Sequence, residues 1–413
     1  MHRDSPKLRF RPDGSFTVMQ ISDIQDRGGV LPRTRELLTA ALDREKPDFV
    51  VFTGDQIKGY SFSLLLGGKE KQDASIGKTI TVLAQLMEER GIPFTVTFGN
   101  HDHDAPMAPD EQLRRYLRSP LCLAEESPEG VSGYANHVIP VAGSQGGGDA
   151  LLFYFLDSHN RTGGLGYDPL DPAQVAWYRE TREAKAVRGR YVPSMLFMHV
   201  PVDEINELYR EVPRGTPGAF PGYLNYKGKY FVLDEDKVNA GAFMGEMPSS
   251  PPINAGLFEA ACEKGDMTGM FFGHDHTNGF HGAVRGIPLG YTPSAGYNAY
   301  GPGRKRGVRV FRFTEDDPRD YETRVVTDEE ILELGDGLAL YTRFADMTPT
   351  SIAAAIPLIV RAGLWIAAFV VSLNAGMLAV KLGGLMGWQG LGIAVGGFAA
   401  LIGAIELIWR LKK

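Results

Sequence analysis

The stretch Phe94 to Asp102 reads FTVTFGNHD, which places a short β-rich run directly before a glycine and three polar side chains. The run predicts a strand over Phe94 to Phe98. Asn100 and His101 then follow where the strand ends and a loop begins. The carboxyl ends of strands in open α/β sheets form the crevice in which ligands bind. This stretch therefore predicts both a strand and part of a binding site.

Two upstream stretches repeat this arrangement. Asp23 follows a predicted strand over Phe16 to Ser22, and Asp55 follows one over Asp48 to Thr53. The segments between the strands have the apolar spacing of helices, which gives a layered α/β pattern. The predicted helices cover Arg33 to Glu45 and Lys78 to Arg90.

The remaining segments before the C-terminal region predict a second sheet and one long insertion. Because further strands bring the total to enough for two packed sheets, we expect a sandwich with outer helices. The many Gly and Pro residues between Asp203 and Asn254 predict a long irregular loop of the kind that often covers active sites. The charged segment Glu315 to Asp346 is expected to end the soluble domain and lead to a membrane. The further strands are predicted at Leu151–Leu156, Ser194–Met198, Gly269–Phe272 and Val308–Phe313.

The composition excludes several classes of protein. Of the 413 residues, 43% are apolar and 23% are charged, which is typical of a globular chain. The net charge of −7 gives no electrostatic reason to expect nucleic acid as a partner. Cys122 and Cys262 lie far apart without metal-ligand spacing, so we expect two free thiols rather than a disulfide framework or a zinc finger.

The C-terminal region contains two uncharged apolar stretches of about bilayer length. They lie between Arg361 and Lys381 and over Leu382 to Ile405, and they predict a hairpin of two transmembrane helices. Two buried core helices are the alternative interpretation. The spacings Gly383 to Gly387 and Gly392 to Gly396 suit close helix packing and allow helix-mediated self-association.

The charges that flank the two stretches predict the orientation. Arg343 and Arg361 precede the first span, and Arg410, Lys412 and Lys413 follow the second. By the positive-inside rule both ends are cytoplasmic, which agrees with a polar N-terminus without a leader. We therefore expect an integral membrane protein with a cytoplasmic domain over residues 1–346 and a juxtamembrane and hairpin segment over residues 347–413.

Three further histidines also follow predicted strands. His199 comes after Ser194 to Met198, and Gly273-His274-Asp275-His276 comes after Gly269 to Phe272. Since strand ends converge in such sheets, carboxylates, an amide and several imidazoles are expected to meet in one crevice.

These motifs together resemble the calcineurin-like metallophosphoesterase superfamily. Its signature of DxH, GDxxx, GNHD, a lone His and GHxH is matched in order and spacing by Asp23-Ile24-Gln25, Gly54-Asp55, Gly99 to Asp102, His199 and Gly273 to His276. The resemblance covers residues 16–278 and implies a four-layer αββα sandwich. Two stretches, 199–201 and 252–258, are also similar to a branch of purple-acid-phosphatase-related proteins.

The resemblance implies a centre of two metal ions. The first ion is expected at Asp23, Asp55 and His276, with Gln25 as an uncertain fourth ligand. The second is expected at Asp55, Asn100, His199 and His274, so that Asp55 bridges the two. Mixed nitrogen and oxygen ligands favour manganese, iron or zinc and do not choose among them.

Two positions depart from the family pattern. Gln25 stands where the family has a metal-binding histidine, and a neutral amide oxygen binds transition metals weakly. The first metal is therefore expected to be held more loosely. Lys58 stands where purple enzymes have a tyrosine, and Tyr60 is out of register, so no iron–tyrosinate colour is expected.

The expected chemistry is hydrolysis of a phosphate mono- or diester by a metal-bridged hydroxide at the cytoplasmic membrane face. His101 is expected to bind the phosphate or protonate the leaving oxygen, and Asp102 to fix the orientation of its ring. The rival interpretation is a catalytically silent, membrane-bound scaffold, which Gln25 favours. Three further sets of residues stay open as pocket or surface groups: His103 with Asp104, Arg161, and Asn278 as a residue that orients His276.

Overall fold

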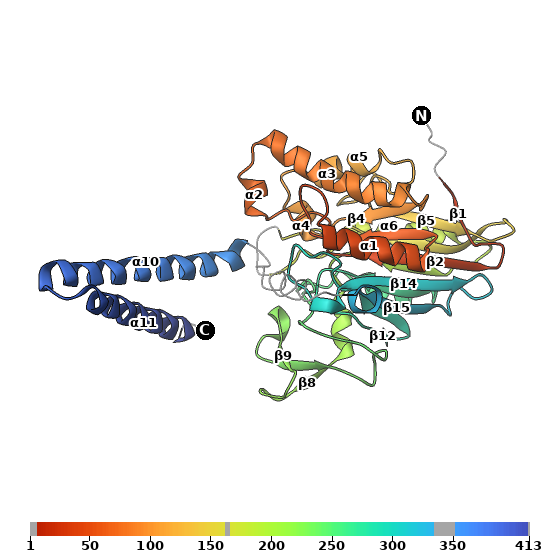
Figure 1. The fold of residues 1–413 in the computed structure, drawn as a ribbon. Coiled ribbons are helices and arrows are strands. Elements are labelled where there is room, and N and C mark those ends of the chain that lie inside the picture. The colour runs from red at the N-terminus through yellow and green to blue at the C-terminus, as the bar shows by residue number, and fades with distance from the viewer. Residues whose placement is uncertain (1–5, 162–165, 334–351, 412–413) are drawn as a thin grey trace. The chain divides into compact units, whose positions relative to one another are not determined.

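The computed structural model describes residues 6–161, 166–333 and 352–411 (Figure 1). The chain divides into two compact units, residues 1–348 and 349–413, and each is described by itself.

The first sheet of the larger unit carries the strands predicted from the N-terminal motifs. Its five strands lie in the order β15-β14-β2-β3-β4. The three strands that precede Asp23, Asp55 and Asn100 are parallel neighbours. β14 runs antiparallel to β2, and the edge strand β15 runs antiparallel to β14. The strands are β2 (Ser15–Ile21), β3 (Phe49–Thr53), β4 (Phe94–Thr97), β14 (Gly307–Thr314) and β15 (Glu322–Thr327).

The second sheet has seven strands in the order β1-β5-β6-β7-β11-β13-β12. Its centre is parallel from β6 through β13, so the strands before His199 and His274 are again neighbours. The strands are β1 (Leu8–Arg9), β5 (His137–Ala142), β6 (Asp149–Phe155), β7 (Ser194–Phe197), β11 (Met267–Phe272), β12 (His281–Val284) and β13 (Ile287–Tyr291).

The two sheets pack face to face through aromatic side chains. Alternate residues of β2 and β3 point inward, and Phe49 stacks on Phe153 of β6 with ring centroids 6.0 Å apart. Because successive side chains of a strand point to opposite faces, the other half of each strand packs against helices. The first sheet is covered by α1 (Pro32–Glu45), α3 (Lys69–Glu88) and α5 (Pro109–Tyr116), and the second by α6 (Pro172–Lys185) and α7 (Leu257–Cys262). The predicted four-layer αββα sandwich is confirmed.

Two segments are more ordered than predicted. The segment between Asp203 and Asn254, expected to be irregular, contains a three-stranded antiparallel sheet in the order β8-β10-β9. The tail from Glu315 contributes β15 to the first sheet, and its residues from 334 onward lie outside the described residues. The short elements are η1 (Asp203–Leu208), β8 (Tyr209–Val212), β9 (Phe220–Pro221), η2 (Leu224–Tyr226), β10 (Tyr230–Leu233), α2 (Phe62–Leu65), α4 (Asn100–His103), η3 (Gly303–Lys305) and α8 (Asp328–Ile331).

The smaller unit is a pair of contacting helices, α10 (Ile352–Gly383) and α11 (Gly387–Leu411). By length and composition, Ile359–Gly383 and Gly387–Leu407 are long and apolar enough to cross a membrane. Arg361 Nε donates to Glu406 Oε1 at 2.8 Å, so a charge near the start of the first candidate span pairs with one near the end of the second.

The glycines expected at the helix contact are not the ones that make it. Among the described residues, a Cβ on Gly387, Gly392 or Gly396 would meet no atom within 4 Å, and one on Gly383 would touch only Leu385. A Cβ on Gly376 would instead overlap the carbonyl oxygen of Gly390. The two helices of the hairpin are therefore in close contact at this pair, since the spacing of glycines within one helix does not show which face meets the other helix.

Candidate metal centre

The parallel strands bring the predicted donor residues together at one end of the sandwich. The backbone amide of Asp23 donates to Gly54 O at 3.2 Å, and that of Gln25 donates to Asp55 O at 2.8 Å, so the loops after β2 and β3 run side by side. The loop after β11 joins the loop after β7, because Gly273 N donates to His199 O at 3.1 Å. One cluster thus forms from both sheets, as the sequence predicted.

Asp55 lies at the centre of this cluster. Its Oδ2 is 3.3 Å from His199 Nε2 and 3.9 Å from His101 Nε2, and it accepts a hydrogen bond from Gln25 Nε2 at 3.0 Å. Its Oδ1 accepts from the backbone N–H of His101 at 2.8 Å. Asp55 therefore contacts groups on both sides of the cluster, which is the arrangement that a bridging carboxylate requires.

The other donors lie around Asp55. Asp23 Oδ1 is 3.2 Å from His276 Nε2, and His274 Nδ1 is 3.3 Å from His199 Nε2. One donor atom from each of Asp23, Asp55 and His276 lies within 4.8 Å of the others. The seven predicted donor residues, which are Asp23, Gln25, Asp55, Asn100, His199, His274 and His276, are all buried.

The donor set fits metal ions. Asp23 Oδ1 and Asn100 Oδ1 are buried without a hydrogen-bond partner among the described residues. A buried polar oxygen without a partner costs about 1–3 kcal/mol, so such atoms call for a ligand. Carboxylate, amide and imidazole groups converging in a buried site are the donors that transition metals bind.

The backbone at this site is strained. Asp23, Gln25, Asp55 and His274 all have positive φ angles, of 53°, 44°, 54° and 75°. Non-glycine residues seldom adopt this conformation, which costs on the order of 1–3 kcal/mol each and concentrates at functional sites. Four of the seven donor residues therefore sit on backbone that only the surrounding packing maintains.

Glycines next to the donors allow the loops to approach one another. A Cβ on Gly54 would lie 2.5 Å from His199 Nδ1, and one on Gly99 would lie 2.6 Å from the backbone nitrogen of Asp55. A Cβ on Gly273 would overlap Ser22 Oγ. The glycines of the motifs are thus required by packing between the loops, since only glycine leaves that space free.

The charges of the cluster depend on each other. Burial alone would raise the pKa of Asp55, but the neighbouring His199 and His101 outweigh it and hold this pKa well below its usual range. Burial would lower the pKa of His199, but Asp55 and Asp23 raise it to about 10. Burial, and then the charge of His199, keep the pKa of His274 well below its usual value. A metal that binds His199 must therefore displace a proton.

His101 reaches the centre with its ring held from two sides. Its Nδ1 bonds to Asp104 Oδ2 at 3.0 Å, and its ring packs against Tyr60 with centroids 4.3 Å apart. Asp102, which was expected to orient this ring, faces the backbone instead. Its carboxylate accepts from the amides of Asp55, Gly99 and Ile57 at 2.6–2.9 Å. Asp104 therefore orients His101, whereas Asp102 fixes the loop that carries Asp55.

Gln25 presents its amide nitrogen to the centre. Gln25 Nε2 lies 3.0 Å from both Asp55 Oδ2 and His276 Nε2, while Tyr60 donates to Gln25 Oε1 at 3.0 Å. In this orientation the amide oxygen faces away from the other donors.

Aromatic residues that the motifs do not include surround the donors. Tyr300 stacks on His276 with ring centroids 4.1 Å apart, and Tyr167 meets the ring of His274 edge-on at 4.3 Å. Tyr300 also donates to Glu246 Oε2 at 2.8 Å. Asn278, considered as a residue that orients His276, accepts from the amides of Gly245 and Glu246. It thus fixes the loop that carries Glu246.

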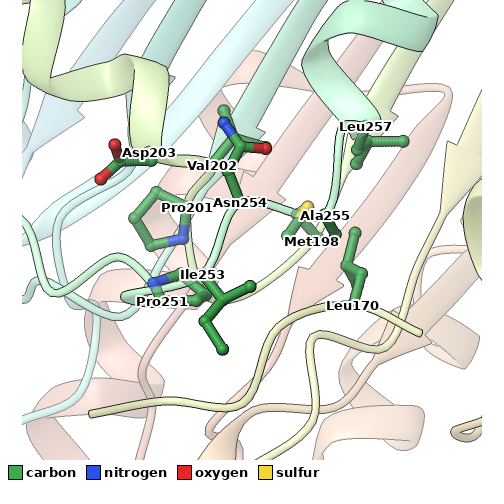
Figure 2. Close-up of a pocket in the computed structure, with 10 residues that line it drawn as sticks. All are labelled: Leu170, Met198, Pro201, Val202, Asp203, Pro251, Ile253, Asn254, Ala255 and Leu257. Atoms are coloured by element: carbon green, nitrogen blue, oxygen red, sulfur yellow. The ribbon is translucent and has the colours of Figure 1, made fainter. Parts of the chain in front are cut away.

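A small hollow lies beside the loop that follows His199 (Figure 2). It has a volume of about 30 Å³, space for little more than one water molecule, and none of the donor residues lines it. Five of its lining residues belong to the two stretches that resemble purple-acid-phosphatase-related proteins: Pro201, Ile253, Asn254, Ala255 and Leu257. Those stretches therefore pack together and support the loop of His199.

Comparisons with known proteins identify the family of this chain. Residues 16–278 match the calcineurin-like phosphoesterase family. Two Arabidopsis thaliana proteins, "Probable inactive purple acid phosphatase 14" and "Probable inactive purple acid phosphatase 29", are 27% and 26% identical, each over 74% of this chain and over 76% and 78% of their own lengths.

Similar solved structures include a dimetal phosphatase from Danio rerio. The likeness has a TM-score of 0.45 at 12% identity and covers 75% of this chain and 98% of that one. The family match extends over more than half of the chain and includes every candidate donor. The chain therefore belongs to the calcineurin-like phosphoesterase family, with relatives among the purple-acid-phosphatase-related proteins.

Proposed function

We propose that this protein hydrolyses a phosphate mono- or diester with two transition-metal ions bound at the buried cluster. The observation that carries the proposal is the convergence of acidic, amide and imidazole donors in which Asp23 Oδ1 and Asn100 Oδ1 accept no hydrogen bond from the described residues. A chain that used the fold only as a scaffold would have no need to bury these oxygens without a hydrogen bond.

The shortest contacts group the donors into two sets. Asp23 Oδ1 lies 3.2 Å from His276 Nε2 but 3.9 Å from His199 Nε2, and His199 Nε2 lies 3.3 Å from His274 Nδ1. We assign the first ion to Asp23, Asp55 and His276, and the second to Asp55, Asn100, His199 and His274. Such a pair of ions polarises phosphoryl oxygens, lowers the pKa of bound water and stabilises an in-line displacement. Manganese, iron and zinc all suit these donors.

His101 is the residue that we assign to the leaving group. Its Nδ1 is occupied by Asp104, which leaves Nε2, 3.9 Å from Asp55, to face the centre. With Nδ1–H donated to Asp104, the ring carries a second proton at Nε2 only as the imidazolium, and we assign that form to protonating the oxygen that leaves. The buried Asp102 supports this geometry indirectly, since it holds the amides of the Asp55 loop.

The alternative is a scaffold with little or no activity. Two observations favour it: the names of the Arabidopsis relatives contain the word "inactive", and Gln25 turns its nitrogen rather than its oxygen toward the donors. Gln25 adds nothing to the first ion in this orientation. The remaining donors of both sets are nevertheless present, which is why we place the enzyme first.

The deciding experiment measures metals and turnover on the same purified protein. Bound metals are quantified, and hydrolysis of an aryl phosphate and of its bis-ester is assayed in parallel with manganese, iron and zinc. We expect two ions per chain and turnover of at least one substrate. Hydrolysis of neither substrate under any metal would establish the scaffold alternative.

We also propose that the two apolar helices anchor the larger unit at the cytoplasmic face of a membrane. The support is their length and composition together with the basic residues that flank them. A reporter fused after Lys413 should then stay cytoplasmic. A reporter found on the other side of the membrane would contradict either the hairpin or its orientation.

A further inference from the structure

The loop that follows β6, residues 157–161, contacts the segment that carries His101, although none of its residues belongs to a family motif. Asp157 pairs with His103 Nε2 at 3.0 Å, and Asn160 Nδ2 donates to Asp104 Oδ1 at 2.9 Å. Asp104 in turn holds His101. The loop is thus fixed to the same short helix, α4, that carries the proposed proton donor.

Arg161 ends this loop and is held by an aromatic side chain. Its Nη2 donates to Tyr167 Oη at 2.6 Å, and the guanidinium carbon lies 4.2 Å from the centroid of the Tyr167 ring. The ring of Tyr167 in turn contacts the ring of His274 edge-on, with 4.3 Å between the ring centroids. Arg161, Tyr167 and the candidate ligand His274 therefore form a continuous chain of contacts from solvent to the metal centre.

The charge of Arg161 is available for a ligand. The side chain is exposed, and within residues 6–161, 166–333 and 352–411 no carboxylate lies at ion-pair distance from it. Arg179 and Arg182 of the nearby helix α6, in contrast, both pair with Glu263. A guanidinium that stacks on a tyrosine and is not neutralised presents its remaining N–H groups in a planar fork that suits carboxylate and phosphate oxygens.

We propose that Arg161, positioned by Tyr167, forms an anion subsite that binds a second anionic group of the substrate, beyond the phosphoryl group that reacts. This inference rests on the proposed function and deepens it. The substrate class is then a phosphate ester with a carboxylate or another phosphoryl group near its leaving group or on its second ester group.

The position of Arg161 is the reason to assign it to a second group. In the proposed function the metal ions bind the phosphoryl group that reacts, and the ring of Tyr167 separates the guanidinium from the candidate ligand His274. Arg161 therefore lies one residue outside the donors, where it can reach a second group of the substrate. A charge-assisted hydrogen bond from Arg161 to a second substrate group therefore selects among substrates and does not act on the bond that breaks.

The experiment compares ligands that differ only by the second charge. Phenylphosphonate, which has no hydrolysable ester bond, is compared with the meta and para carboxyphenylphosphonates by calorimetric titration of the full-length protein loaded with manganese. The wild type should bind at least one carboxylate isomer about tenfold more tightly than phenylphosphonate, because a charge-assisted hydrogen bond contributes roughly that factor. Arg161→Gln should remove this preference.

Two further variants sharpen the comparison. Tyr167→Phe keeps the ring and loses the hydroxyl that fixes the guanidinium, so it should retain part of the preference. Arg190→Gln, at an exposed arginine on the turn after α6, is the matched control and should keep both the preference and the aryl phosphate turnover. Metal content is measured for every variant, so that loss of the ions is not mistaken for loss of the subsite.

The outcomes separate this inference from the proposed function. A wild type without any preference, or an Arg161→Gln protein that retains it, overturns the subsite even when aryl phosphates are hydrolysed. An equal loss of affinity for all three ligands also overturns it, because Arg161 would then contact the first phosphoryl group. A preference that depends on Arg161 in a protein that hydrolyses nothing supports the subsite and rejects the enzyme.

Discussion

The donors of the metal centre and the residues around them are built in different ways. The donors follow the ends of parallel strands, on loops held by glycines and by left-handed backbone. Tyr167 and Tyr300 touch the donors His274 and His276 through their rings, and Tyr60, on the loop that carries Asp55, packs on His101. The comparison teaches that backbone and close packing hold the donors, the inner layer, whereas side-chain contacts place the residues around them, the outer layer.

The largest effect is expected from a donor that contacts both sides of the centre. Asp55→Asn keeps the shape of the side chain and removes its charge, so we expect loss of at least one ion and a fall in turnover on the order of 10³-fold, because the ions supply several kcal/mol. Metal analysis and the aryl phosphate assay measure both. Full metal content with normal turnover would show that Asp55 is not the bridge.

Substitution of His101 separates a role in catalysis from a role in metal binding, since His101 faces the centre without being a proposed ligand. His101→Ala should lower turnover about 10²-fold, as expected for loss of a general acid, while both ions stay bound. Unchanged turnover with the metals in place would remove its assignment as the proton donor.

The packing of the inner layer is tested at a glycine. A Cβ on Gly99 would lie 2.6 Å from the backbone nitrogen of Asp55, and backbone cannot move aside as a flexible side chain can. Gly99→Ala should therefore destabilise the protein by about 1–3 kcal/mol, the usual cost of overpacking, and weaken metal binding. Chemical denaturation measures the free energy of unfolding.

The matched control for this change is Gly68→Ala. Gly68, the exposed N-cap of α3, has an ordinary φ of −68° and no described atom within 4 Å of its added Cβ. Its substitution should cost less than about 1 kcal/mol, because only the preference of an N-cap for glycine over alanine is lost. Equal effects at the two glycines would contradict the view that the motif glycines are required by close packing.

The smallest effect is expected in the outer layer. Asp104→Asn weakens the acceptor that holds His101 Nδ1, and changes of such supporting partners typically reduce activity about tenfold or somewhat more. The steady-state assay should show a lower kcat at constant metal content. Asp110→Asn, at an exposed residue that pairs only with Arg114 among the described residues, is the control and should leave kcat unchanged. A loss of metal in Asp104→Asn would instead place Asp104 with the inner layer.

The strands, the sandwich and the residues that meet at the candidate site could be predicted from the sequence. A strand that runs into Gly99, Asn100 and His101 is a local pattern, and local patterns survive in a linear sequence because neighbouring residues decide them. The same holds for the two apolar helices, whose length and composition are also local properties.

Other features depend on contacts between distant segments, and only the tertiary structure decides them. The sequence does not show that Asp104 rather than Asp102 holds His101, that Gln25 turns its nitrogen inward under the hydroxyl of Tyr60, or that Gly376 faces Gly390. Each follows from the direction in which a side chain or a helix face points after folding. The sequence by itself thus determined which atoms are available for chemistry, and the packing of strands and loops decided which of them meet.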